Sequence, residues 1–313
     1  MITEPGIYDI PSETYHADPC PEPSLSASMI NDILTAPAKC RENSRRLNPD
    51  WQEPEGQEKF TIGTVSHLMF LEPHLFDERV VVCAFDDWRK KEAKEARAAA
   101  KDAGKTAILA KQMDKILAAR AAFLAHGCTR SAFAGGRFEQ SLFWRHPTYG
   151  FWCRARPDFL ADSLAHMNDY KATANADPSQ FGRHAYNMGY HRRAAWYLEG
   201  VTAVFGKRPE HYWFCNQEVK APHLTSVVEL DWSALEAGQE ENDLAAAIYA
   251  KCLGSGEWCG YRDQEHPDTD RAFRVGMPPY AYMQIDERMK RPRPEWAAKA
   301  EANHRALMEE EVE

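Results

Sequence analysis

Residues 154–171 read RARPDFLADSLAHMNDYK, and this stretch decides the fold. Apolar residues in runs of strand length at 151–161 and 166–172 predict two β-strands. The polar pair at 162–163 begins a turn between them, because short polar side chains favour turns. The stretch therefore predicts an antiparallel hairpin.

Three charged side chains of this hairpin suit metal-dependent chemistry. Side chains alternate along a strand, so Asp169 and Lys171 lie on one face while Tyr170 lies on the other. Pairing of the strands brings Asp158 close to Asp169. Converging carboxylates bind a hard cation such as Mg²⁺, and a neighbouring amine orients water or stabilises charge on a phosphate. We predict Asp158, Asp169 and Lys171 as catalytic residues; an ordinary hairpin with exposed charges is the alternative.

Outside the hairpin, the hydrophobic periodicity alternates between helices and strands. Helices are predicted between 24–28 and Pro37, and at 60–71, 87–105, 108–126, 178–205, 231–253 and 295–310. Further strands are predicted at 79–85, 138–145, 211–219 and 224–230. This order predicts an α/β fold with a central mixed β-sheet flanked by helices.

We expect a single domain at residues 1–290, followed by a charged helical tail at 291–313. The domain begins with a proline-rich arm at 1–23. Two charged or amphipathic helices form an insertion at about 86–127. No internal repeat or low-complexity linker divides the chain.

The composition fits a folded protein without a membrane span. The 313 residues are enough for one large core, and no run of about 18 apolar residues occurs. The first residues lack the basic start and apolar centre of a signal peptide, so we expect a cytoplasmic protein. The formal net charge of −9 is unusual for a nucleic-acid binder, but an acidic exterior can coexist with a basic channel.

Eight cysteines are scattered along the chain, and none forms a C-x-x-C pair. In a cytoplasmic protein this pattern predicts buried thiols. An iron–sulfur cluster on Cys40, Cys252 and Cys259 with a fourth ligand is the alternative. Its spacing is poor, so we expect no cluster.

The helix predicted at 178–205 carries a basic and aromatic face. Four residues that step by four, three and four positions share this face: Tyr186, Tyr190, Arg193 and Tyr197. Arginines hold phosphates and rings support bases, and Arg154 is expected on the same strand face as Asp158. The predicted DNA-binding residues are Arg154, Tyr190, Arg192, Arg193 and Tyr197. Core packing of the rings, with the arginines reaching solvent, is the alternative.

At this point the chain resembles a family, the RecE-like exonucleases (exonuclease VIII) of the PD-(D/E)xK nuclease superfamily. The pattern of Asp158 with Asp169-Tyr170-Lys171 is similar to the superfamily core. The other similar stretches are GTVSHLMFLEP at 63–73, SLSAS at 24–28 followed by Ala36-Pro37, GYHRRAAWY at 189–197 and WCGY at 258–261. Together they span about residues 7–285.

The resemblance implies that His67 is a third metal ligand beside Asp158 and Asp169. Mg²⁺ is the implied cofactor, with Mn²⁺ as a substitute. The implied activity is digestion of double-stranded DNA ends from 5′ to 3′ in phage recombination, with a single-strand annealing protein as partner and a homo-oligomeric ring as assembly. For His67, a core histidine satisfied by a backbone carbonyl is the alternative.

One position departs from the family pattern. The motif Q-x-x-x-Y has Arg193 in place of its Gln, with Tyr197 after it. Arginine contacts a phosphate strongly but cannot accept a hydrogen bond. The change keeps one rival function open, a DNA- or protein-binding module with an altered active centre. A separate rival is an endonuclease, or a nuclease subunit with an iron–sulfur cluster.

Overall fold

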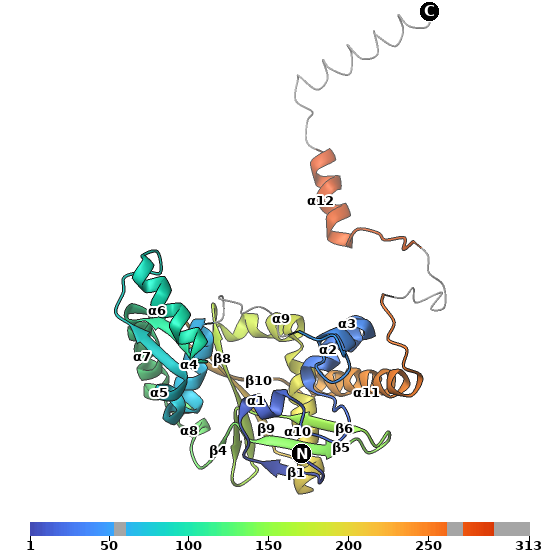
Figure 1. The fold of residues 1–313 in the computed structure, drawn as a ribbon. Coiled ribbons are helices and arrows are strands. Elements are labelled where there is room, and N and C mark those ends of the chain that lie inside the picture. The colour runs from blue at the N-terminus through green and yellow to red at the C-terminus, as the bar shows by residue number, and fades with distance from the viewer. Residues whose placement is uncertain (53–60, 262–271, 291–313) are drawn as a thin grey trace, which may run out of the picture. The chain divides into compact units, whose positions relative to one another are not determined.

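The computed structural model describes residues 1–52, 61–261 and 272–290 (Figure 1). None of the helices in these ranges is both long enough and apolar enough to span a membrane. The predicted tail at 291–313, with its helix, lies outside the described residues.

Two compact units make up the chain, residues 1–261 and residues 262–313. In the second unit, the described residues form one helix, α12 at Pro279–Met289. The predicted domain boundary after residue 290 stays a prediction. The candidate functional residues all belong to the first unit.

A five-stranded sheet forms the centre of the first unit (Figure 1). In sheet order, the strands are β10 at Thr225–Glu229, β9 at His211–Glu218, β8 at His166–Thr173, β7 at Phe159–Ala161 and β4 at Gly136–Phe138. β8 and β9 are parallel, whereas the other neighbours are antiparallel. The predicted central mixed sheet is thus confirmed.

Helices cover both faces of this sheet. On one face, α4 at Thr61–Leu71 and α7 at Ala110–Ala125 bury Tyr170 of β8 between apolar side chains. On the other face lie α2 at Ala27–Thr35, α10 at Tyr190–Phe205 and α11 at Trp232–Ser255, which enclose the largest core. Because side chains alternate along β8, Asp169 and Lys171 face the side opposite to Tyr170.

A second sheet joins the N-terminal arm to the domain. Its three strands are β1 at Gly6–Tyr8, β5 at Ser141–Arg145 and β6 at Trp152–Ala155, in that order. The arm also forms the short helix α1 at Ser12–His16. The predicted proline-rich arm at 1–23 therefore contains a strand and a short helix that belong to the fold.

The single strands expected at 138–145 and 151–161 are wrong, because each is divided between the two sheets. Pro157 lacks a backbone N–H and cannot continue the ladder of a central strand. Glu139 has φ 51°, a left-handed conformation that turns the chain between β4 and β5. The two breaks lie side by side, since the Glu139 N–H donates to the Asp158 carbonyl at 3.1 Å. The two sheets meet here.

The helix expected at 178–205 is also divided, into α9 at Pro178–Met188 and α10. Gly189 stands between them with φ 67°, a conformation that favours glycine. Tyr186 therefore belongs to α9, where its side chain is 69% exposed. It does not share the α10 face of Tyr190, Arg193 and Tyr197.

The predicted insertion contains both expected helices, α6 at Lys91–Asp102 and α7. Between them, β3 at Thr106–Leu109 pairs in parallel with β2 at Val80–Cys83. The strand β3 was not predicted, because its short apolar run merges with the pattern of α7. The remaining short helices are α3 at Pro37–Asn43, a 3₁₀ turn at Pro73–Leu75, α5 at Phe76–Arg79 and α8 at Gly127–Ala132.

Candidate functional site

The hairpin of β7 and β8 sets Asp158 opposite Asp169. The two strands pair with Phe159 opposite Asn168, and Asp158 faces Asp169 one residue further along this register. The backbone N–H of Tyr170 donates to Asp158 Oδ2 at 2.6 Å. Both aspartates are buried, so the hairpin holds two carboxylates close together away from bulk solvent.

Lys171 lies beside the second of these carboxylates. Its Nζ is 2.6 Å from Asp169 Oδ2, an ion pair that the alternation along β8 predicts. Asp169 Oδ2 is nevertheless buried without a partner in hydrogen-bond geometry. This oxygen therefore keeps the capacity to bind a further group.

His67 reaches Asp158 from α4 but forms no ion pair with Asp169. Its Nε2 lies 3.4 Å from Asp158 Oδ2, and the side chain is 40% exposed. The ring nitrogen thus faces Asp158, which is one of the two aspartates that the family resemblance places beside it. The role of His67 as a metal ligand stays a prediction.

Glu139 is the residue that the sequence did not reveal. Its Oε1 lies 3.7 Å from His67 Nε2 and is buried without a hydrogen-bond partner. Its Oε2 accepts a hydrogen bond of 2.6 Å from Arg156 Nε. Arg156 thus fixes one oxygen of the carboxylate, while the other faces the histidine. The available signal was an acidic residue directly after the strand β4. This signal does not suffice, because Glu139 reaches the cluster only when β4 pairs with β7, which is distant in the sequence.

His67, Glu139 and Asp158 form a cluster with the geometry of a cation site. One ligand atom from each residue can be chosen so that all three lie within 4.8 Å of one another. Among the described residues, no other group of three or more His, Cys, Asp or Glu side chains meets this condition, and Cys40, Cys252 and Cys259 do not. One oxygen each from Glu139 and Asp158 and one imidazole nitrogen fit a hard divalent cation. The Glu139 oxygen Oε1 has no hydrogen-bond partner in the protein.

The charges of this cluster are coupled to one another. Burial and the charge of Asp158 together raise the pKa of Glu139 to about 7, although His67 and Arg156 act to lower it. Burial acts to lower the pKa of His67, but Asp158 and Glu139 raise it to about 9. At neutral pH, a proton on His67 therefore balances part of the negative charge, and this proton must leave when a cation binds.

The two aspartates shift in opposite directions. Burial acts to raise the pKa of Asp158, but His67 and Lys171 hold it well below its usual range. Burial raises the pKa of Asp169, and the Lys171 ammonium offsets this only in part. Asp158 is therefore the firmly ionised member of the pair.

Residues of α10 border the cluster on the Asp169 side. Arg193 Nη1 lies 3.7 Å from Asp169 Oδ2, and its guanidinium stands 5.5 Å from the Tyr190 ring centroid. Lys171 Nζ lies 5.3 Å from the same ring. Tyr197 packs at an angle against the buried ring of Tyr212, with centroids 6.4 Å apart. The structure thus brings Tyr190 and Arg193 to the site, with Tyr197 one turn further along the helix.

The structure places Arg154 and Arg192 away from this cluster. Arg154 Nη1 donates to the Ser24 carbonyl at 2.6 Å and lies 3.1 Å from Asp18 Oδ2. It does not share a strand face with Asp158, because the strand ends before Pro157. Arg192 Nη1 donates to Glu241 Oε2 at 2.6 Å. The DNA contacts of both arginines stay predictions, without support from this geometry.

Comparison with known proteins gives the family. Residues 26–265 match the family described as "PDDEXK-like domain of unknown function (DUF3799)". The chain belongs to this family. The resemblance to PD-(D/E)xK nucleases that was based on the DYK and related motifs is thereby confirmed.

A solved structure also shares the fold. A candidate exonuclease from Eubacterium rectale is 14% identical, with a TM-score of 0.56 over 89% of this chain and 98% of that chain. An alkaline exonuclease from Laribacter hongkongensis is 15% identical over 53% of this chain and 82% of that chain, and its TM-score of 0.24 is too low to support a common fold. No curated protein matches this chain.

Proposed function

We propose that this protein is a Mg²⁺-dependent exonuclease that hydrolyses phosphodiester bonds from the ends of double-stranded DNA. The observation that carries the proposal is the cluster of His67, Glu139 and Asp158, whose ligand atoms lie within 4.8 Å of one another. The cluster lies within residues 26–265, which match a PDDEXK-like domain. Mn²⁺ is expected to substitute for Mg²⁺, because both prefer oxygen ligands.

The proposed metal ligands are His67, Asp158 and Asp169, with Glu139 added. A bound cation supplies a water of lowered pKa and polarises the scissile phosphate. The Asp169 carboxylate borders this position, and its buried Oδ2 has the capacity to ligate. Lys171, 2.6 Å from that oxygen, orients the attacking water or stabilises the charge that develops on the phosphate. Asp158, Asp169 and Lys171 are thus the proposed catalytic residues.

Tyr190 and Arg193 are the proposed DNA contacts nearest to the cluster, and Tyr197 stands behind them. Arg193 keeps a charge beside Asp169, where a phosphate bound to the metal would lie. Arg154 and Arg192 are bonded within the protein and are not included. Digestion from 5′ to 3′, a role in recombination, an annealing partner and a ring-shaped homo-oligomer follow from the family resemblance. Action in the cytoplasm is kept as the expectation from the sequence.

The test uses linear and closed circular duplex DNA of the same sequence. With Mg²⁺ the protein is expected to degrade the linear form and to leave the circle intact. Chelator and the substitution Asp169→Ala should each abolish this degradation. Cutting of the circle would indicate an endonuclease, and binding without degradation would indicate a module with an altered centre.

A matched control separates loss of catalysis from loss of folding. Asp243→Ala removes an acidic residue of α11 that lies outside the candidate site, so this variant should keep the rate of the native protein. Thermal unfolding of both variants checks that Asp169→Ala is folded. If Asp169→Ala retains full activity on linear DNA, the proposal is wrong.

A further inference from the structure

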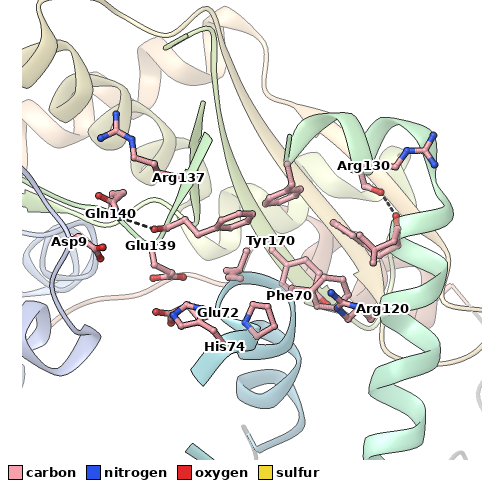
Figure 2. A pocket seen from close by; sticks show the side chains of 17 residues that line it. Asp9, Phe70, Glu72, His74, Arg120, Arg130, Arg137, Glu139, Gln140 and Tyr170 are labelled. Atoms are coloured by element: carbon pink, nitrogen blue, oxygen red, sulfur yellow. Dashed lines mark hydrogen bonds between the residues drawn. The ribbon is translucent and has the colours of Figure 1, made fainter. Parts of the chain in front are cut away.

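A pocket of about 680 Å³ adjoins the carboxylate cluster on the side away from α10. It shares Glu139 and Tyr170 with the candidate site (Figure 2). Its other walls come from the end of α4, from α7 and α8, and from β4. This volume lies within the range of small-molecule sites, about 300–1,000 Å³.

Aromatic rings dominate the walls of this pocket. Phe70 stacks on Tyr170 with centroids 4.4 Å apart, and Phe133 and Phe138 are almost parallel, at 5° and 6.2 Å. Phe70, Phe133 and Phe138 are only half-buried, so the packing of the core does not consume their whole surface. Partly exposed rings around a concave site offer stacking surfaces for a flat ligand.

The charges of the pocket differ from one side to the other. Figure 2 shows Glu72 and Glu139 on one side and Arg120 and Arg130 on the other. Arg137 also lies on the side of Glu139, where its guanidinium is 3.2 Å from Asp162. On the acidic side, Glu139 belongs to the candidate cation site, so one phosphate of a DNA strand would be held there through the metal. A nucleotide within a strand has a second phosphate on its other side, and the arginines offer it a positive charge. The pocket therefore combines the features that a nucleotide needs: rings for the base and a positive group at each end.

We propose that this pocket binds the nucleotide at the end of the strand, which is the nucleotide that cleavage releases. Its base stacks on the rings of Phe70, Phe133 and Phe138, and its outer phosphate faces Arg120 and Arg130. Recognition tolerates all four bases, because each base offers a π-face and the rings offer no hydrogen-bonding pattern. This inference rests on the proposed exonuclease function, which requires a place for the leaving nucleotide.

The inference is tested by calorimetric binding of free nucleotides to the full chain in the presence of Mg²⁺. The probes are dAMP, dTMP and deoxyribose 5-phosphate, which has the phosphate but no base. The native protein should bind dAMP and dTMP at least about tenfold more tightly than the sugar phosphate, since stacking of a base accounts for this difference. A free nucleotide and the last nucleotide of a DNA strand share this chemistry. If the pocket takes the strand end, added dAMP should inhibit the degradation of linear DNA; if it takes only free nucleotides, dAMP should bind without inhibiting.

Phe133→Leu is the decisive variant, because leucine keeps apolar volume but removes the π-face. It should weaken dAMP binding by at least about fivefold and leave binding of the sugar phosphate unchanged. The matched control is Phe205→Leu, a half-buried phenylalanine of α10 that lies outside the pocket. This control should bind dAMP as the native protein does. Thermal unfolding confirms that both variants are folded, and Phe138→Leu provides a second test if Phe133→Leu does not fold.

The outcomes separate this inference from the proposed function. If the native protein degrades linear DNA but binds dAMP no better than the sugar phosphate, the pocket inference is wrong and the exonuclease proposal stands. Equal binding of dAMP by native protein and by both pocket variants also overturns the inference. If dAMP binds through these rings but linear DNA stays intact, the proposed exonuclease function fails instead.

Discussion

Asp18 and Asp169 are both buried aspartates, with 4% and 2% of their surface exposed, and their surroundings differ. Asp18 accepts hydrogen bonds on both oxygens, from the Ser24 N–H at 2.8 Å and from Ser24 Oγ at 2.7 Å, and Arg154 lies 3.1 Å away. Asp169 Oδ2 instead lies 2.6 Å from the Lys171 ammonium and 3.7 Å from Arg193, and no backbone or hydroxyl group donates a hydrogen bond to it. A buried carboxylate that serves only the fold has its hydrogen bonds fixed by backbone and hydroxyl groups, whereas one held only by charged side chains keeps room for a ligand.

The largest expected effect is the loss of activity when Asp169, the aspartate of the candidate site, is replaced. Asp169→Asn should lower kcat/KM on linear DNA by at least about 10³-fold, because it removes a metal-facing charge worth several kcal/mol. Stability should stay close to that of the native protein, because two effects oppose each other. The raised pKa of Asp169 means that its charged form costs free energy above the unfolded pKa, and the amide removes this cost. The amide also leaves Lys171 without its ion-pair partner, which destabilises the fold. Initial rates and urea unfolding measure both effects; activity within threefold of native contradicts the account.

The same substitution at Asp18 should lower the stability of the protein and leave its activity unchanged. Asp18→Asn breaks a buried ion pair with Arg154 and should lower the free energy of unfolding by about 3–5 kcal/mol. Activity per folded molecule should stay within about twofold of native, because Asp18 does not contact the cluster. Urea unfolding and active-site-normalised rates test this prediction. A large loss of kcat with normal stability would mean that the two aspartates do not differ as described.

The pH dependence of the metal requirement sharpens the comparison. Below pH 7 both His67 and Glu139 carry protons, since their pKa values are about 9 and about 7, and cation binding must displace them. The Mg²⁺ concentration for half-maximal activity should therefore decrease as pH rises from 6 to 9, by up to about tenfold per pH unit for each displaced proton. His67→Gln should flatten the upper part of this profile. An identical Mg²⁺ requirement at pH 6.5 and pH 8.5 contradicts the assignment.

A smaller effect is expected where this chain departs from the family motif. Arg193→Gln removes the guanidinium that lies 3.7 Å from Asp169 Oδ2. We expect KM for DNA to increase by roughly three- to tenfold, because a charged contact to phosphate is lost. Arg193→Lys keeps the charge, so its KM for DNA in steady-state kinetics should lie between those of the native protein and Arg193→Gln. An unchanged KM in Arg193→Gln would place this arginine outside the DNA path.

The smallest effect is expected for Arg192, which pairs with the partly exposed Glu241. Arg192→Ala should lower stability by no more than about 1 kcal/mol, the usual value for pairs near the surface. KM for DNA should stay as in the native protein. An increase in KM as large as that of Arg193→Gln would instead support the DNA contact predicted for Arg192 from the sequence.

These contrasts also show which parts of the molecule a sequence can predict. The β7–β8 hairpin and the meeting of Asp158 with Asp169 depend on alternation and a local turn, and both can be read within 20 residues. The opposite faces of Lys171 and Tyr170 follow from the same alternation. Local periodicity therefore predicts the core of the candidate site.

What depends on distant pairing could not be predicted in this way. Glu139 reaches the cluster only because β4 pairs with β7, and the pattern at 138–145 reads as one continuous strand. The assignment of β5 and β6 to another sheet likewise depends on tertiary contacts with the N-terminal arm. Gly189 did carry a local signal, since a glycine within a helical pattern can mark a break.

The central claim is that the buried carboxylates beside His67 bind a divalent cation. Crystals of the full chain soaked in Mn²⁺ and measured at the manganese absorption edge test it directly. The account predicts an anomalous peak about 2.0–2.4 Å from His67 Nε2, a Glu139 oxygen and an Asp158 oxygen, and no peak at Asp18. A fully soaked crystal with no peak among these residues, or with manganese bound elsewhere alone, would contradict it.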